Sequence, residues 1–170
     1  MLLEVVRPKT ELFGNFLYKS CRSNLTKMTA RESDNIIKEV KTAFDELVKY
    51  SEQAQLNLFL SYYDNSPAFL HFSSDGKMRN YEEFKKICSE YYISINQQKL
   101  STIAEKFNVV DTNLVIVGWT GNIIAHFKNG DTMIMNDYSV TNVFKRMEGG
   151  WRIAHSHESS LPPEIIKSKK

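Results

Sequence analysis

The stretch that decides the fold is GGWRIAHSHESSLPP, residues 149–163. It opens with two glycines, which favour a tight turn, and it continues as a strand with a tryptophan at its start. Because side chains alternate along a strand, Trp151, Ile153, His155 and His157 are expected on one face. Trp151 and Ile153 mark that face as the buried one. Both histidines are therefore predicted to point inward or into a subunit interface.

The residues before this stretch predict further antiparallel strands. From about residue 97 the apolar pattern has a period of two, and turn residues interrupt it at 111–113, 129–130 and 149–150. Asn129–Gly130 is a strong hairpin signal. The pattern predicts four strands, at about residues 98–110, 113–128, 131–147 and 150–159.

The first half of the chain predicts helices. Apolar residues recur every three or four positions from Asp34 to Tyr50, and Ser33 or Asp34 is a suitable cap. A short helix is expected within 54–64 and a short strand at 68–72. A third helix is expected from Tyr81, with Asn80 as its cap. Three helices followed by antiparallel strands predict an α+β fold, in which the helices pack on one face of a strongly bent antiparallel sheet and enclose a conical space.

Composition narrows the class of protein. The chain has 170 residues, which suits one domain, and its net charge of +2 argues against a dedicated nucleic-acid binder. No apolar run approaches the roughly 20 residues that span a bilayer, and the start is a poor secretory signal, so a cytoplasmic protein without membrane contact is expected. We expect a loosely ordered extension at 1–33, a domain at 34–163 and a basic tail at 164–170.

The order of these elements resembles a known family. The segment FLSYYDNSPAFLHFSSDGKMRNYEEF and the ending GGWRIAHSHESSLPP are similar to the SnoaL-like branch of the nuclear transport factor two-like superfamily, over roughly residues 34–163. The same ending is similar to the association domain of calcium/calmodulin-dependent kinase II. The superfamily includes ketosteroid isomerases, polyketide cyclases, dehydratases, transport adaptors and oligomerisation modules. The resemblance therefore implies a cone-shaped fold and leaves the activity open.

Three interpretations of His155 and His157 compete. Both imidazoles can be hydrogen-bonded core or interface residues, or one can bind a ligand or transfer a proton near neutral pH. The third is a metal site, which would need another ligand such as Asp137 or His126, and the spacing supplies none. We expect no metal and no cofactor. His157 lies nearer the end of the strand and is predicted to be the functional histidine, and His155 the structural one.

Other candidate site residues are a carboxylate and a set of aromatic side chains. Strands are poor in aspartate, so Asp137 is either a solvent-facing residue or a pocket base. Tyrosine hydroxyls in an apolar cavity suit a small-molecule site. The predicted catalytic pair is His157 and Asp137, and the predicted ligand-binding residues are Tyr62, Tyr63, Tyr91, Trp119, Tyr138 and His155.

Two classes of function fit these features. The first is a domain that binds a small apolar, carboxylate or carbonyl ligand in the cone, with isomerase-like or dehydratase-like acid–base activity. The second is a non-catalytic oligomerisation or adaptor module with a vestigial pocket. A homodimer is expected in either case, because Ile116, Ile124 and Val140 would leave an apolar patch on the outer face of a monomer's sheet.

Overall fold

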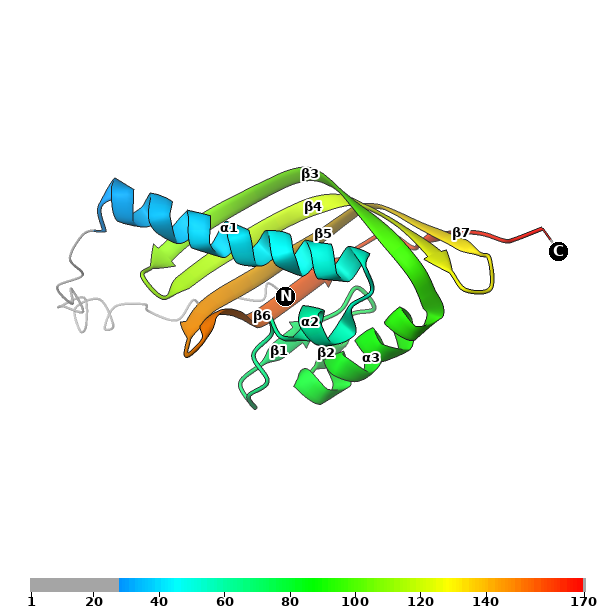
Figure 1. Ribbon diagram of the computed structural model, residues 1–170, viewed down its shortest axis with the longest axis horizontal. Coiled ribbons are helices and arrows are strands. Elements are labelled where there is room, and N and C mark those ends of the chain that lie inside the picture. Colours follow the sequence, from blue (N-terminus) through cyan, green and yellow to red (C-terminus); the bar gives the residue numbers. More distant parts are fainter. Residues whose placement is uncertain (1–27, 170) are drawn as a thin grey trace, which may run out of the picture.

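The computed structural model describes residues 28–169 and has helices packed against one face of a long, curved sheet (Figure 1). The expected α+β class is confirmed. Most of the predicted N-terminal extension lies outside the described residues. The last part of this predicted extension is wrong, because residues 30–33 belong to the first helix. Among the described residues no helix is both long enough and apolar enough to cross a membrane.

The first helix, α1 (Ala30–Glu52), begins earlier than the sequence pattern predicts. Thr29 is its N-cap in place of Ser33 or Asp34. Its side chain accepts a hydrogen bond from the backbone N–H of Glu32, and the Glu32 carboxylate accepts one from the backbone of Thr29. This capping box adds a turn of helix before the apolar stripe starts. The stripe, which includes Val40 and Phe44, then faces the sheet.

Two further helices follow α1 in the chain. Helix α2 (Leu56–Leu60) is a short segment within the predicted range. Helix α3 (Tyr81–Ser94) starts where predicted, with Asn80 and Glu83 forming a second capping box. Figure 1 shows both below α1, at the end of the sheet where β1 (Leu70–Phe72) and β2 (Met78–Arg79) lie.

The sheet has seven strands. Their bounds are β1 (Leu70–Phe72), β2 (Met78–Arg79), β3 (Ile95–Asp111), β4 (Leu114–Phe127), β5 (Thr132–Met147), β6 (Gly150–Ser159) and β7 (Glu164–Ile166). The order is β2-β1-β6-β5-β4-β3, with β7 paired to the start of β5. The four long strands are antiparallel and match their predicted ranges closely. The sheet as a whole is mixed, because β1 runs parallel to β6. The predicted basic tail instead contributes the strand β7.

A bend in the middle of the sheet makes it concave. At Gly121 the Trp119 ring folds back over the backbone, and an added Cβ would lie 2.4 Å from both Trp119 Cζ2 and the Ser101 carbonyl oxygen. The Trp119 indole N–H donates to Thr102 Oγ1 at 2.9 Å, which fixes the ring in this place. Only glycine fits at position 121, and the bend there lets the sheet wrap around the space that the helices cover.

Candidate active site

The concave face and the helices enclose a cavity of about 330 Å³. This volume lies within the range of small-molecule sites. Apolar side chains of α1, α2 and α3 form one side of it, including Leu47, Phe59, Phe84 and Ile87. Polar side chains gather on the strands opposite. They include His71, Tyr138, Asn142 and Glu158.

An extra residue in β6 decides which side chains reach this cavity. Val143 pairs with His155 and Phe144 pairs with Ile153, so Ala154 has no partner in β5 and forms a bulge. The bulge reverses the alternation of side chains for the rest of the strand. Glu158 therefore lines the cavity, and the predicted inward face of His155 and His157 is wrong.

Both histidines lie on the outer face of the sheet. Their ring centroids are 5.9 Å (His155) and 5.7 Å (His157) from the ring of Phe72. His155 is half-buried there, and burial together with the neighbouring His157 lowers its pKa. His157 is exposed. Neither residue lines the cavity, so the catalytic role predicted for His157 and the ligand contact predicted for His155 gain no support from their position.

A second bulge places Asp137 outside the cavity. Gly121 pairs with Tyr138 and Ile123 with Met135, so two residues of β5 lie opposite one residue of β4. Asp137 takes a left-handed backbone with φ of 54°, and its N–H donates to Asn122 Oδ1 at 3.1 Å. Its side chain is exposed. The bulge turns Tyr138 inward instead, where it lines the cavity.

Four of the predicted ligand-binding aromatics line the cavity, and Tyr62 does not. The four are Tyr63, Tyr91, Trp119 and Tyr138. The Tyr62 hydroxyl donates to the Glu46 carboxylate on α1, and burial, together with this contact, raises the pKa of Tyr62. The Tyr91 hydroxyl is also engaged, because it donates to Gln98 Oε1 at 2.7 Å.

His71 is a site residue that the sequence analysis did not single out. It lies in the middle of β1, where the parallel pairing with β6 places it opposite Ser156. The side chain is fully buried against the ring of Phe84, with centroids 4.5 Å apart. Burial, with the nearby Arg79 guanidinium, lowers the pKa of His71 to about 4. The imidazole is therefore neutral at physiological pH.

Glu158 faces His71 across a small gap. Its Oε2 lies 3.9 Å from His71 Nε2, which is too long for a hydrogen bond. The Glu158 side chain keeps 25% of its surface exposed, because it borders the cavity. Burial raises the pKa of Glu158 to about 7, while the Tyr138 hydroxyl beside it acts in the opposite direction. Glu158 can therefore exchange a proton near neutral pH.

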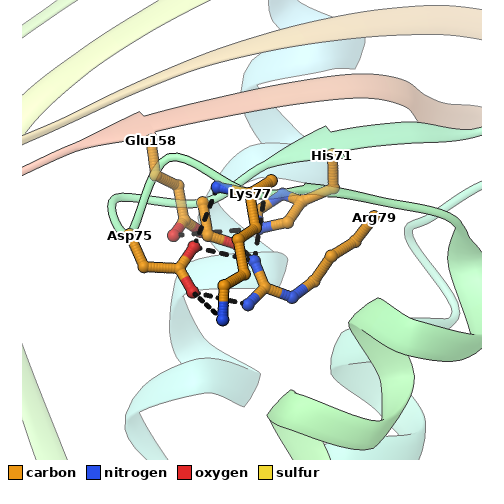
Figure 2. Close-up of polar contacts among 6 residues, drawn as sticks. His71, Asp75, Lys77, Arg79 and Glu158 are labelled. Atoms are coloured by element: carbon orange, nitrogen blue, oxygen red, sulfur yellow. Dashed lines mark hydrogen bonds and ion pairs between the residues drawn. The ribbon is translucent and has the colours of Figure 1, made fainter.

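A charged hairpin covers this pair (Figure 2). The Arg79 guanidinium donates to both carboxylate oxygens of Asp75, at 2.9 and 2.7 Å, and to Ser73 Oγ. The Arg79 contact holds the pKa of Asp75 well below its usual range. Figure 2 shows His71 and Glu158 directly beside this ion pair. Because Asp75 binds Arg79 at both carboxylate oxygens, much of the positive charge near Glu158 is neutralised.

Asp64 is an acidic residue with a structural role in a turn. Asp64 accepts hydrogen bonds from the backbone N–H and the hydroxyl of Ser66, at 2.9 and 2.8 Å, so it serves the turn before Pro67. It does not line the cavity of Glu158.

Within residues 28–169, no group of three or more His, Cys, Asp and Glu side chains is placed to hold a metal ion.

Comparison with known proteins places these features in a family. The model of the SnoaL-like domain matches residues 40–163. No curated protein sequence matches the chain. Solved structures match it closely in fold at low sequence identity.

Three of these structures illustrate the likeness. A protein of Novosphingobium aromaticivorans, provisionally named a scytalone dehydratase, has 6% identity and a TM-score of 0.71, over 83% of this chain and 94% of the other. A nuclear transport factor 2-like superfamily protein of Salmonella enterica has 18% identity and a TM-score of 0.64, over 76% and 94%. The hexachlorocyclohexane dehydrochlorinase LinA-type3 of Novosphingobium barchaimii has 6% identity and a TM-score of 0.66, over 81% and 94%.

Proposed function

Since the chain belongs to the SnoaL-like domain family over residues 40–163, we propose that its cavity binds a small, mostly apolar molecule and transfers a proton on it. Glu158 is the proposed acid–base group and His71 its neutral partner. The reaction class is an isomerisation or an elimination, both of which begin with removal of a proton from carbon.

The observation that carries this proposal is the open pair of Glu158 and His71. The two side chains face each other inside an apolar cavity without a hydrogen bond between them, and they are 3.9 Å apart. A direct hydrogen bond would have given the His71 nitrogen and the Glu158 carboxylate each a partner. The gap instead leaves Glu158 and His71 available to the same bound molecule.

The two groups have different parts in the proposed step. A base works best when its pKa lies near the working pH, and the pKa of Glu158 is about 7. The Glu158 carboxylate removes the proton from carbon. The electron pair left on carbon moves toward a leaving group or into an adjacent carbonyl. His71 stays neutral, because its pKa is about 4, and its N–H donates to the oxygen on which charge develops.

The fold neighbours support an elimination. One is provisionally named a dehydratase and another is named a dehydrochlorinase, and both names describe loss of a small group from neighbouring carbons. The polar side chains in the cavity also favour a ligand site over the vestigial pocket of a pure oligomerisation module.

The test uses a neutral substrate that any well-placed base can open. In 5-nitrobenzisoxazole, removal of the ring C–H proton breaks the N–O bond and releases a coloured phenolate. We expect wild-type protein to accelerate this reaction with a rate that rises through pH 7. Glu158→Gln should lower kcat/KM at least tenfold. His157→Gln, one residue away but on the outer face, is the matched control and should leave it unchanged.

Two results would count against the proposal. One is a rate that Glu158→Gln does not reduce. The other is a decrease in kcat/KM in His157→Gln as large as that in Glu158→Gln. That result would indicate that His157, the histidine that the sequence pattern favoured, is the catalytic group.

A further inference from the structure

A buried row of polar side chains crosses three strands on the inner face of the sheet. Asn142 in β5 pairs in register with Ser156 in β6, and Ser156 pairs with His71 in β1. Their exposed fractions are 2%, 1% and 0%, respectively. The three side chains therefore lie side by side, with Glu158 two residues further along β6. Asn142 and His71 both line the cavity.

Three atoms of this row have no hydrogen-bond partner among residues 28–169. They are Asn142 Oδ1, His71 Nδ1 and His71 Nε2. A buried polar atom left unpaired costs about 1–3 kcal/mol, and native proteins contain few of them. All three atoms lie on residues that line the same cavity, which indicates that a bound molecule supplies hydrogen-bond partners to this row.

The kinds of atom decide what that molecule must offer. A neutral imidazole has one N–H donor and one acceptor nitrogen, and Asn142 Oδ1 is an acceptor. The row therefore lacks two donors and one acceptor. A carboxylate or phosphate brings acceptors only, and it would lie beside Glu158. The nearby cation Arg79 is already bound to Asp75. A hydrocarbon brings neither donor nor acceptor.

We propose that the row selects a neutral ring compound that carries a hydroxyl group, and that Asn142 is the residue that determines this specificity. The hydroxyl donates to Asn142 Oδ1 and accepts from the His71 N–H, while the ring lies against the apolar wall of α1 and α3. This inference deepens the proposed function and rests on it for the use of the cavity.

The first measurement compares three ligands of similar shape on the wild-type protein. These are 2-naphthol, 2-methylnaphthalene and 2-naphthoate, with affinity measured by isothermal titration calorimetry. A hydroxyl, a methyl group and a carboxylate thus occupy the same ring position. We expect 2-naphthol to bind at least tenfold more tightly than either of the others. No detectable binding of 2-naphthol, or equal binding of 2-naphthoate, would overturn the proposal without any variant.

The second measurement uses Asn142→Leu, which keeps the approximate shape and removes the acceptor. The preference for 2-naphthol over 2-methylnaphthalene should fall to less than threefold, while 2-methylnaphthalene binds as before. The melting temperature of the unliganded variant should be equal to or higher than that of wild type, since an unpaired buried oxygen is gone. Thr141→Val, the neighbouring exposed residue on the outer face, is the control and should retain the full preference. An undiminished preference in Asn142→Leu would overturn the assignment.

The two proposals fail in different ways. The ring opening of 5-nitrobenzisoxazole needs a base and no hydroxyl on the substrate. Selective 2-naphthol binding without Glu158-dependent ring opening would therefore reject the catalytic proposal and keep this one. Glu158-dependent ring opening without hydroxyl preference would reject this one and keep the catalytic proposal.

Discussion

Glu158 follows His157 directly in the chain, yet the two side chains lie on opposite faces of the sheet. His157 lies outside beside Phe72, and Glu158 lies inside beside His71. Neighbouring residues of a regular strand alternate in this way. Which of the two points inward depends on the bulge at Ala154, four residues earlier.

The first prediction concerns the pH dependence of stability through Glu158. Its pKa rises from 4.5 to about 7 on folding, so the folded state holds a proton that the unfolded state has lost between these values. The stability that this group contributes is complete below pH 4.5 and is lost as the pH rises through about 7. Glu158→Gln removes this loss. The melting temperature of the variant minus that of wild type should therefore increase from pH 4.5 to pH 8.

Calorimetric scans of both proteins across this range measure that difference directly, and subtraction cancels the titration of unrelated groups. A difference that stays constant with pH would show that Glu158 has an ordinary pKa in the folded protein.

The second prediction concerns His71, for which the sign is opposite. Its pKa falls from 6.5 to about 4 on folding, so the unfolded state binds the extra proton between these values. The stability from this group is complete above pH 6.5 and is lost as the pH falls through about 4. His71→Leu should therefore gain melting temperature relative to wild type on acidification from pH 6.5 to 4.

In wild type the effects of Glu158 and His71 on stability oppose each other between pH 4.5 and 6.5. The pair therefore contributes almost no slope to the dependence of the melting temperature on pH in this range. Each single variant should reveal the slope of the residue that remains. Equal slopes in His71→Leu and wild type would contradict the burial of a neutral imidazole.

The third prediction concerns the bend of the sheet. Gly121→Ala would bring a methyl group within 2.4 Å of backbone and ring atoms, so the strand must move. We expect a loss of at least about 2 kcal/mol in the free energy of unfolding, as for other overpacked sites. Gly118→Ala, on the same strand with open space around it, should change that free energy by less than about 0.5 kcal/mol. Urea denaturation of the two variants measures both values, and similar values for the two would reject the steric account.

The fourth prediction concerns self-association, which stays a proposal. Ile124 is 38% exposed on the outer face, opposite the partly buried Ile134 of β5, and Ile116 lies on the same face. Val140, expected on that face, lines the cavity instead. We expect a homodimer through the outer face, and Ile124→Lys should convert it to a monomer of 19.7 kDa.

Light scattering at micromolar concentration measures the mass. Ile93→Lys changes a residue of α3 that is 72% exposed; it is the matched control and should leave the dimer intact. A monomeric wild-type protein would reject the proposed interface.

Local signals in the sequence were enough for the fold. The capping box at Asn80, the Asn129–Gly130 turn and the Gly149–Gly150 turn each fix the end of an element through contacts of a few residues. The start of α1 was misplaced because Thr29 and Ser33 are both good caps, and only Thr29 has a glutamate three residues later.

The candidate site needed information that alternation alone does not contain. A bulge is one extra residue, and nothing about the small Ala154 marks it as unpaired in the sequence. His71 could have been found as the single imidazole in the short apolar strand AFLHF. Its meeting with Glu158, however, depends on the parallel pairing of β1 with β6, which joins segments far apart in the chain.

The unpaired Ala154 also has a genetic consequence. Loss of the single codon for Ala154 would remove the one residue of β6 that has no partner in β5, and the rest of the strand would keep its present pairing. Glu158 would still face the cavity, and His155 and His157 would still lie on the outer face. Only a one-residue shift that pairs Ala154 itself with β5 would bring the two histidines to the cavity face. A one-residue deletion at this position therefore spares the carboxylate site.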